Sequence, residues 1–374
     1  MEQKIIIKDP LYKQILLSHQ FKNIIDSKEF QRLRYIKQTS FVDYVYPNAN
    51  HTRFSHSLGV YHLMEKVLNN GLINNISKKE KTNLLLASLL HDIGHGPFSH
   101  FWESVFPHFD HEKTTIEILE KKGLNDVAKI IKGDSKYSYL ISSTIDVDKL
   151  DYMARDSYFS GVSYGVAEVD FIIQHMYIKD NKIVIKPSAI SSVEDLITQR
   201  VNLFKTVYYH KFSIAYDFLL RSILKRAKYL YKNKKNIELN KSLENFFNKS
   251  NTLKDILELN DVIVLNHILL WQNNKDEILK DLCQRFIERK KFAVKNLNYE
   301  KVNLKKLKKE VSKKYDINYY YSEIEIPLRI IQTDLYVEID GKIKNLEEIS
   351  DLIKFYKKQN WKVSYVIYPR DIKF

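Results

Sequence analysis

The chain has 374 residues, a formal net charge of +14 and 44% hydrophobic residues, so it can bury a large core as one domain or two unequal ones. It has no apolar run of about 18 residues, and its N-terminal apolar stretch is too short for a signal peptide, so we expect no membrane segment. Cys283 is the only cysteine, which excludes an internal disulfide and a multi-thiolate zinc site and favours a reducing, cytoplasmic location.

Hydrophobic spacing predicts a mostly α-helical chain up to about residue 310. Val60, Met64 and Val67, for example, follow the i, i+4, i+7 spacing of an amphipathic helix, and Gly71 is expected just beyond the end of that helix. We expect helices over residues 29–37, 53–69, 78–93, 98–105, 111–122, 147–159 and 193–232 and over parts of 251–292.

Strand patterns are fewer and gather towards the C-terminus. A hairpin is expected over residues 177–187, where Asp180-Asn181 separates two β-rich runs. The composition changes after about residue 315, and we expect strands over 319–326, 334–339 and 363–368, a turn at Asp340-Gly341 and a helix over 346–358. The predicted fold class is mostly α with a small C-terminal α+β lobe: a helical domain over 1–310, with its motifs within 26–211, and a lobe over 315–374 that carries no recognisable chemistry.

The most informative residues are two imidazoles and two carboxylates on three predicted helices: His56, the His91-Asp92 pair and Asp148. A buried histidine and a buried aspartate need partners, and a divalent metal with positions left open for water and substrate satisfies both. A lone His-Asp dipeptide is usually structural. The flanking stretches 53–59 (Arg-Phe-Ser-His-Ser-Leu-Gly) and 146–156 favour a metal site here.

These motifs carry a family resemblance. Residues 30–38 (Phe-Gln-Arg-Leu-Arg-Tyr-Ile-Lys-Gln), 51–60 and 91–100 resemble HD-domain phosphohydrolases, and among these the deoxynucleoside triphosphate (dNTP) triphosphohydrolase branch of bacterial dGTPases and the vertebrate SAM-and-HD-domain enzyme. Residues 146–156 and the segment from Arg200 to Lys211 extend the match, which covers about residues 5–220. The resemblance implies an HD-domain helical fold and hydrolysis of a dNTP to deoxynucleoside and tripolyphosphate.

The resemblance also implies one divalent metal per active site. His56, His91, Asp92 and Asp148 match the metal ligands of the family. A mixed imidazole and carboxylate set suits Mn, Fe, Zn, Ni or Mg and does not choose among them. Such a metal would orient an α-phosphate and lower the pKa of a bound water.

Catalytic roles are implied for three histidines and a glutamate. The resemblance puts His95 and His111 near the attacked phosphorus and gives His100 the role of proton donor to the leaving 5′-oxygen, a task for an imidazole that titrates near neutrality. Glu103 stands where the vertebrate enzyme has aspartate, and it would orient a histidine. His95 as a ligand of a second metal is an alternative that stays open.

The substrate contacts that the resemblance implies come from four parts of the chain. Arg53 offers a guanidinium fork to phosphate oxygens, and Gln38 lies beside the 3′-hydroxyl, although the neighbouring Thr39 replaces a leucine of the vertebrate enzyme. The resemblance further implies that Lys149 and Arg200 bind phosphate and that Tyr152 lines the sugar pocket. It implies that Asp156 holds the 3′-hydroxyl and that Tyr208 packs against C2′ of the sugar. Tyr208 as a core aromatic is the structural alternative.

On the helix expected over 147–159, Asp148, Tyr152 and Asp156 follow a helical face. Asp151 and Arg155, four residues apart, are more simply interpreted as a structural ion pair.

Partners are less well defined by the sequence. The resemblance implies a homo-oligomer, a dimer or a tetramer, and leaves open a nucleotide activator, since Asp26, Gln31 and Arg34 match the activator site whereas Asp170 and Thr206 replace its arginines. Two other functions remain as alternatives: an HD phosphohydrolase acting on another nucleotide or nucleic-acid phosphate ester, and a basic nucleic-acid-binding regulatory protein. The lysine-rich stretch 301–314 lacks the aromatic interleaving of a single-strand binder. The stretch 225–241 has only Tyr229 and Tyr231, which a helix would point roughly 200° apart, and we interpret both stretches as solvated helix faces.

Overall fold

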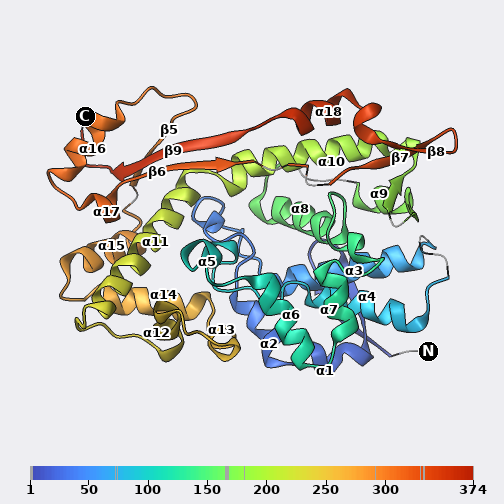
Figure 1. Ribbon diagram of the computed structural model, residues 1–374, viewed down its shortest axis with the longest axis horizontal. Helices are drawn as coiled ribbons and strands as arrows, with labels where there is room; N and C mark the ends of the chain where they lie inside the picture. Colours follow the sequence, from blue (N-terminus) through green and yellow to red (C-terminus); the bar gives the residue numbers. More distant parts are fainter. Residues whose placement is uncertain are drawn as a thin grey trace.

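The computed structural model (Figure 1) describes residues 3–71, 73, 75–164, 168–180, 182–290, 292–328, 330–331 and 333–373. The helices are α1 (Lys22–Ile25), α2 (Lys28–Gln31), α3 (Arg53–Asn69), α4 (Lys78–Leu90), α5 (His100–Val105), α6 (His111–Lys121), α7 (Asn125–Lys132), α8 (Val147–Ser160), α9 (Val169–Gln174), α10 (Ile190–Leu203), α11 (Lys211–Lys232), α12 (Lys241–Asn248), α13 (Leu253–Glu258), α14 (Asp261–Trp271), α15 (Glu277–Ile287), α16 (Leu304–Ser312), α17 (Ile317–Tyr320) and α18 (Asp351–Lys358). The strands are β1 (Lys4–Asp9), β2 (Lys13–Ser18), β3 (Met176–Lys179), β4 (Lys182–Ile185), β5 (Phe292–Asn296), β6 (Ser322–Pro327), β7 (Tyr336–Ile339), β8 (Lys342–Asn345) and β9 (Lys362–Pro369).

The mostly helical fold class is confirmed, and so is an α+β region at the C-terminus. The helix expected over 53–69 is α3, with the predicted bounds, and α6 and α8 end within one residue of their predicted ends. The hairpin expected over 177–187 is β3 and β4, although Asn181 of its predicted turn lies outside the described residues. The turn at Asp340-Gly341 joins β7 to β8, and both turn residues have positive φ, at 50° and 72°.

Four predicted helices differ from the structure. The helix expected over 78–93 ends at Leu90, and the helix expected over 98–105 begins only at His100 because Phe98 and Ser99 have positive φ. The single helix expected over 193–232 is instead α10, a π-helical turn over Phe204–Tyr208 and α11. The helix expected over 29–37 is the short α2 followed by a 3₁₀ turn over Arg32–Tyr35.

Strands are the elements that sequence periodicity missed: β1, β2, β5 and β8 were not expected. β1 and β2 form an antiparallel hairpin, a second sheet has the order β3-β4-β7-β8 with β4 and β7 parallel, and a third has the order β5-β9-β6. The strands of residues 315–374 therefore pair with strands from earlier in the chain. The division into domains 1–310 and 315–374 stays a prediction. Figure 1 shows β6 and β9 running along one edge of the molecule, with β9 extending from α18 towards α17.

Two buried apolar clusters flank the segment that carries the histidines. The first contains residues of α3, α4, α8 and α10, and the second contains Phe98, Trp102 and residues of α11 to α15. Residues 91–100 pass from the first cluster to the second, so the predicted catalytic segment is fixed at both ends. Among the described residues, no helix has the length and apolar character that crossing a bilayer requires.

Candidate metal centre and active site

Two glycines allow the elements of the site to approach each other. A Cβ on Gly59 of α3 would lie 1.9 Å from Oδ1 of Asp151 in α8, so only glycine lets these two helices pack at this distance. A Cβ on Gly94 would lie 2.4 Å from the backbone O of His111 and from the backbone N of Thr115, so glycine also admits the start of α6. The residues predicted as metal ligands and as catalytic histidines are held together by these close approaches.

The four predicted metal ligands meet at one place. Nε2 of His56 lies 3.3 Å from Nε2 of His91 and 3.0 Å from Oδ1 of Asp148. Oδ1 of Asp92 lies 3.5 Å from Nε2 of His91, and Oδ2 of Asp92 lies 3.7 Å from Nε2 of His56. His56 is fully buried, whereas the Asp148 side chain is 25% exposed, so the cluster has one side open to ligands.

The hydrogen bonds of the two imidazoles direct their Nε2 atoms to a common cation. Nδ1 of His91 lies 2.9 Å from the Ser88 carbonyl oxygen, which only accepts, so this nitrogen carries the hydrogen. Nδ1 of His56 lies 2.8 Å from Oδ2 of Asp151, the carboxylate–histidine arrangement found behind metal ligands. Burial raises the pKa of Asp151, but Arg155 and His56 outweigh it and lower the pKa to about 2. Both Nε2 lone pairs are then available to one metal.

The charge of the cluster also favours a bound cation. Burial lowers the pKa of His56, but hydrogen bonds to Asp148 and Asp151 outweigh it and raise the pKa to about 10. The protein alone thus holds a proton between these carboxylates, and a divalent cation would take the place of that proton. The donor set fits a divalent metal, with His56, His91, Asp92 and Asp148 as the residues that would hold it.

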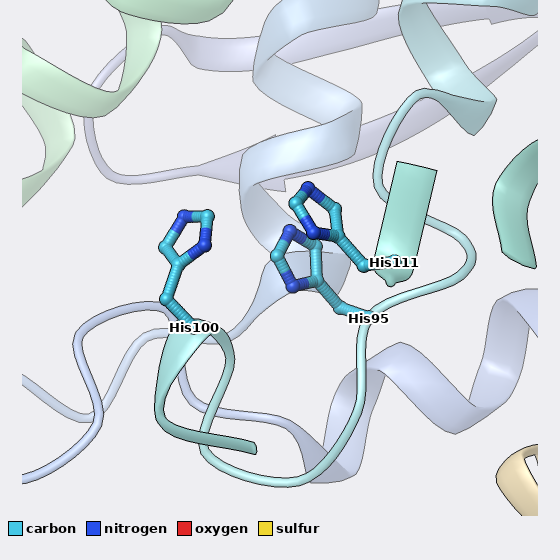
Figure 2. Close-up of side chains that lie close together, drawn as sticks. All are labelled: His95, His100 and His111. Atoms are coloured by element: carbon cyan, nitrogen blue, oxygen red, sulfur yellow. The ribbon is translucent and has the colours of Figure 1, made fainter. Parts of the chain in front are cut away.

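Three further histidines adjoin this cluster (Figure 2). The rings of His95 and His111 stack with centroids 3.9 Å apart, and His100 lies across from them at the start of α5. Nε2 of His95 lies 3.3 Å from Oδ1 of Asp92, which connects the histidines to the predicted metal ligands. One ring nitrogen from each of the three histidines lies within 4.8 Å of the others, so the second-metal alternative for His95 stays open.

Glu103 holds two of these histidines. Its Oε1 accepts hydrogen bonds from the backbone N (2.8 Å) and from Nδ1 (2.7 Å) of His111, and its Oε2 lies 3.4 Å from Nδ1 of His100. Burial raises the pKa of Glu103, but the bonds to His100 and His111 outweigh it and hold the pKa far below its ordinary value. The carboxylate therefore stays ionised and fixes the hydrogen of His111 on Nδ1, which leaves Nε2 for chemistry. Burial, with Arg53 and His111 nearby, holds the pKa of His95 well below its ordinary value, so His95 is neutral.

Arg53 and Lys149, predicted phosphate contacts, are partly engaged within the protein. Arg53 pairs through Nη1 with Oδ2 of Asp92 and donates from Nε to the Ser99 hydroxyl over 2.7 Å. Lys149 donates from Nζ to Oδ2 of Asp146 over 3.0 Å. These bonds hold both cations beside the predicted metal ligands.

The predicted sugar pocket contains Asp156 and Tyr208. The two oxygens of Asp156 are 2.6 Å from Nε2 of His51 and 2.6 Å from the hydroxyl of Tyr208, which donates. Tyr208 belongs to the π-helical turn that interrupts the helix expected over 193–232, so this turn sets its position. Burial raises the pKa of Tyr152, which lies on α8 one turn beyond Asp148 and one turn before Asp156.

Arg200 and Gln38 each have at least one buried polar atom without a hydrogen-bond partner among the described residues. Nε and Nη1 of Arg200 and Oε1 of Gln38 have no hydrogen-bond partner among the described residues. Buried polar atoms in native proteins are nearly always hydrogen-bonded, so each exception requires an explanation. A bound ligand would supply the missing partners.

Sequence reasoning missed two parts of the site. The ion pair expected between Asp151 and Arg155 is confirmed, with Arg155 Nε 2.8 Å from Asp151 Oδ2, but the contact between Asp151 and His56 was not foreseen. His51 belongs to the 51–60 motif, which gives it no role, although in the structure it holds Asp156. Its position ahead of Arg53 gave the only signal.

The larger of two described cavities, about 360 Å³, opens beside Glu103 rather than over the predicted metal ligands. It is lined by Glu103 and by polar residues of α6 and of the segment before α13, such as Lys113 and Asn251. The second cavity, about 200 Å³, lies between Thr144, Lys182 and Thr333. Neither of these two cavities is lined by the predicted substrate contacts.

Comparisons with known proteins agree with this geometry. The model of the HD domain matches residues 53–156, and that of the HD-associated region matches residues 168–368. The chain is 35% identical to the uncharacterized protein YwfO of Bacillus subtilis over 80% of this chain and 73% of that one. It is 26% identical to the deoxynucleoside triphosphate triphosphohydrolase SAMHD1 of Bos taurus over 95% of this chain and 70% of that one. A solved phosphohydrolase from Bacteroides thetaiotaomicron has a TM-score of 0.90 at 31% identity and covers 98% of this chain and 100% of its own.

The predicted metal ligands and catalytic residues lie within the matched HD domain, as do the predicted substrate contacts apart from three. Gln38 precedes that domain, and Arg200 and Tyr208 lie in the matched HD-associated region. The chain belongs to the HD-domain phosphohydrolase family, with an HD domain followed by an HD-associated region.

Proposed function

We propose that this chain hydrolyses a deoxynucleoside triphosphate to a deoxynucleoside and inorganic tripolyphosphate. The observation that carries the proposal is Arg200, whose buried guanidinium has two nitrogens without a partner among the described residues. Arginine stays charged in proteins, and a buried charge without a partner is costly, so an anionic ligand is favoured here. Arg200 lies near the end of α10, which leads directly into the π-helical turn of Tyr208, so this anion would lie beside the predicted sugar pocket.

The binding roles follow from the contacts. Lys149 and Arg200 would bind phosphate oxygens. Asp156, fixed by His51 and Tyr208, would accept a hydrogen bond from the 3′-hydroxyl. When bound, a divalent metal supplies Lewis-acid chemistry by polarising the attacked phosphate. Similarity to the triphosphohydrolase SAMHD1 over most of the chain supports a triphosphate substrate.

The proposed reaction breaks the bond between the α-phosphorus and the 5′-oxygen. A water oxygen attacks the α-phosphorus and remains in the tripolyphosphate, while Nε2 of His111 accepts the proton that the water loses. His100 donates a proton to the leaving 5′-oxygen. The His100 side chain is 71% exposed and can therefore reach a substrate that enters from solvent.

One experiment tests the reaction. The protein is incubated with each dNTP and NTP in Mn, Fe or Mg, and the products are separated by chromatography. We expect deoxynucleoside and tripolyphosphate, with ribonucleotides turned over more slowly because their 2′-hydroxyl would lie unpaired against the ring of Tyr208. Turnover only of another phosphate ester, or release of pyrophosphate, would replace this proposal with a different HD phosphohydrolase activity.

A variant of Arg200 tests the observation itself. Arg200→Met keeps the buried apolar volume and removes the unpaired charge, so we expect unchanged or higher thermal stability. The same variant should raise KM for dNTP about tenfold or more, because a charge-assisted contact to phosphate is lost. An unchanged KM would show that Arg200 binds no part of the substrate.

We further propose that the chain acts as a homo-oligomer, a dimer or a tetramer, with nucleotide activation as an option. Gln31 donates from Nε2 to the Ile25 carbonyl over 2.8 Å and accepts from Nε of Arg34, so two of the matched activator residues are held as a pair. Light scattering with and without added nucleotide tests both points. A monomer with full activity would remove the oligomer proposal.

A further inference from the structure

The turn that leads into the helix of His100 has an unfavourable backbone conformation. Phe98 and Ser99 have φ of 55° and 58°, in the left-handed region that residues other than glycine rarely adopt. Such a conformation is costly for residues other than glycine and persists only where the surroundings enforce it. The turn joins the segment of His95 to the first residue of α5, His100, so it sets the position of the proposed proton donor.

Hydrogen bonds to two other segments, residues 37–40 and the start of α14, hold this turn. The Ser40 hydroxyl donates to the Phe98 carbonyl over 2.7 Å, and the Ser99 hydroxyl donates to the Lys37 carbonyl over 2.7 Å. The backbone N of Phe98 donates to Oδ1 of Asp261 over 2.7 Å. Asp261 is the first residue of α14 and lies in the HD-associated region, 163 residues further along the chain.

Asp261 also holds a second segment of the site. Its Oδ2 accepts a hydrogen bond from the backbone N of Lys37 over 2.9 Å, next to Gln38, whose unpartnered Oε1 is part of the predicted substrate pocket. Asp261 is 3% exposed, so both bonds are shielded from water. One carboxylate therefore connects the turn before His100 to the segment of Gln38.

The start of α14 is also connected by hydrogen bonds to the segment that follows the predicted metal ligands. Arg32 donates from Nη1 to the carbonyl of Leu259 over 3.0 Å and from Nη2 to the carbonyls of Ile93 (3.0 Å) and His95 (2.7 Å). Leu259 and Asp261 flank the start of α14. The start of α14 thus reaches both ends of the segment that carries His95 and His100.

We propose that Asp261 is a positioning residue for the reaction: it holds the Phe98–Ser99 turn and the Lys37–Gln38 segment together, so that His100 and Gln38 face one substrate. This inference rests on the proposed function. It gives the HD-associated region a task in the active site of the HD domain, without contact between Asp261 and the substrate or the metal.

The test compares Asp261→Asn with Asp255→Asn. Asp255 is also buried, and its carboxylate accepts bonds from Thr252 and Asn245. Within the part of the chain that the structure describes, it accepts none from an active-site segment, so it is a matched control for lost stability. An amide offers one acceptor oxygen in place of two, so Asp261→Asn loses one backbone bond and sets its amide N–H₂ against the other N–H. Ser40→Ala, which removes only the bond to the Phe98 carbonyl, serves if Asp261→Asn does not fold.

We expect Asp261→Asn to lower kcat for dNTP hydrolysis about tenfold or more, with KM changed less and metal content unchanged, because a small displacement of a catalytic group has effects of this size. Hydrogen exchange should become faster at the amides of Lys37 and Phe98. Asp255→Asn should lose similar thermal stability but keep kcat within about twofold. Ser40→Ala should lower kcat in the same direction as Asp261→Asn, by less.

Two results would overturn the inference: faster exchange at Lys37 and Phe98 with unchanged kcat, or an equal loss of kcat in the Asp255 control. If the proposed function itself is wrong, the result is different: the wild-type protein would release no tripolyphosphate from any dNTP. In that event exchange at the two amides still decides whether Asp261 holds them.

Discussion

Asp151 shows how much a single residue of this site depends on distant parts of the chain. Its Oδ2 holds Nδ1 of His56, and its Oδ1 accepts from the hydroxyl of Tyr12, which follows β1. Arg155 bonds both oxygens and also pairs with Asp9 at the end of β1. The orientation of His56, a predicted metal ligand, is therefore supported from the N-terminal hairpin.

The metal ligands give the first residue-scale prediction. Asp92→Asn and His56→Ala should each lose bound metal and dNTP hydrolysis while the helical circular dichroism spectrum is kept, because the ligands come from three elements that pack through other residues. Elemental analysis should find one equivalent of metal in the wild-type protein. Stoichiometric metal retained in both variants contradicts the ligand assignment, and two equivalents in the wild type would support the second-metal alternative.

The histidine cluster gives the second prediction. His100→Ala and His111→Ala should each lower kcat about a hundredfold or more with metal still bound, the usual scale for a lost acid or base. A nucleotide analogue with a better leaving group at the 5′ position needs less protonation, so it should recover much of the rate in His100→Ala but not in His111→Ala. An equal loss with both substrates would remove His100 from the proton-donor role.

At the residue scale, the sequence could predict the residues that lie in local motifs and not the residues that support them. His56, His91, Asp92 and Asp148 could be proposed because a donor set of imidazoles and carboxylates is uncommon without a metal. Asp261 could not be proposed, because its partners Lys37 and Phe98 are more than 160 residues away and use only backbone N–H groups, which leave no mark in the sequence.

At the scale of elements, the contact between α3 and α8 decides whether the metal ligands meet. Gly59→Ala should destabilise the protein by about 1–3 kcal/mol and lower metal content, because the added methyl displaces Asp151 from His56. Thermal unfolding and elemental analysis measure the two effects. Gly123→Ala is the control: this glycine has φ of 72° and open space around it, so alanine there adds backbone strain without touching the site. Equal metal loss in both variants would contradict the argument.

The start of α14 gives a prediction about pH. Burial raises the pKa of Asp261 from its ordinary value of 3.8 to about 6, against the lowering effect of the backbone N–H groups of Lys37 and Phe98. The folded protein thus binds this proton more tightly than the unfolded chain, so the stabilisation is complete below pH 3.8 and is lost as the pH rises through about 6.

Relative to Asp261→Asn, which cannot titrate, the wild-type protein should therefore lose stability between pH 4 and pH 7. The loss should be about 3 kcal/mol at most, from a shift of roughly two pKa units. Urea unfolding of both proteins at each pH gives the difference. A difference that does not change, or that grows in favour of the wild type as the pH rises, would contradict the raised pKa.

Elements with strong local signals were predicted well, and elements that depend on distant partners were not. α3 has amphipathic spacing in its second half, at Val60, Met64 and Val67, and keeps its predicted bounds. β5 and β8 were missed because short strands in this chain are defined by pairing with β9 and β7, which the local pattern does not contain. The sequence predicts continuous helix through the π-helical turn before α11, because the residues of this turn, Phe204–Tyr208, fit helical spacing equally well.

At the scale of the whole molecule, the net charge of +14 is the observation that could favour the nucleic-acid-binding alternative over the enzyme. Positive charge in the two lysine-rich stretches is partly neutralised: Lys313 pairs with Glu310, Lys314 with Asp371, and Arg226 with Asp276 beyond α14. Such charge attracts the phosphate backbone without reading sequence, and the attraction falls steeply with salt.

We therefore expect duplex DNA to bind no more tightly than about 10 µM at 150 mM salt and to bind more tightly only at low salt, as non-specific contacts do. Because the lysine-rich stretches lie outside the catalytic cluster, added DNA should leave kcat and KM for dNTP unchanged at 150 mM salt. Fluorescence anisotropy with labelled DNA and a turnover assay in parallel make the comparison. Tight binding that resists salt, in a protein that turns over no dNTP, would favour the regulatory nucleic-acid-binding function, since charge alone would not account for it.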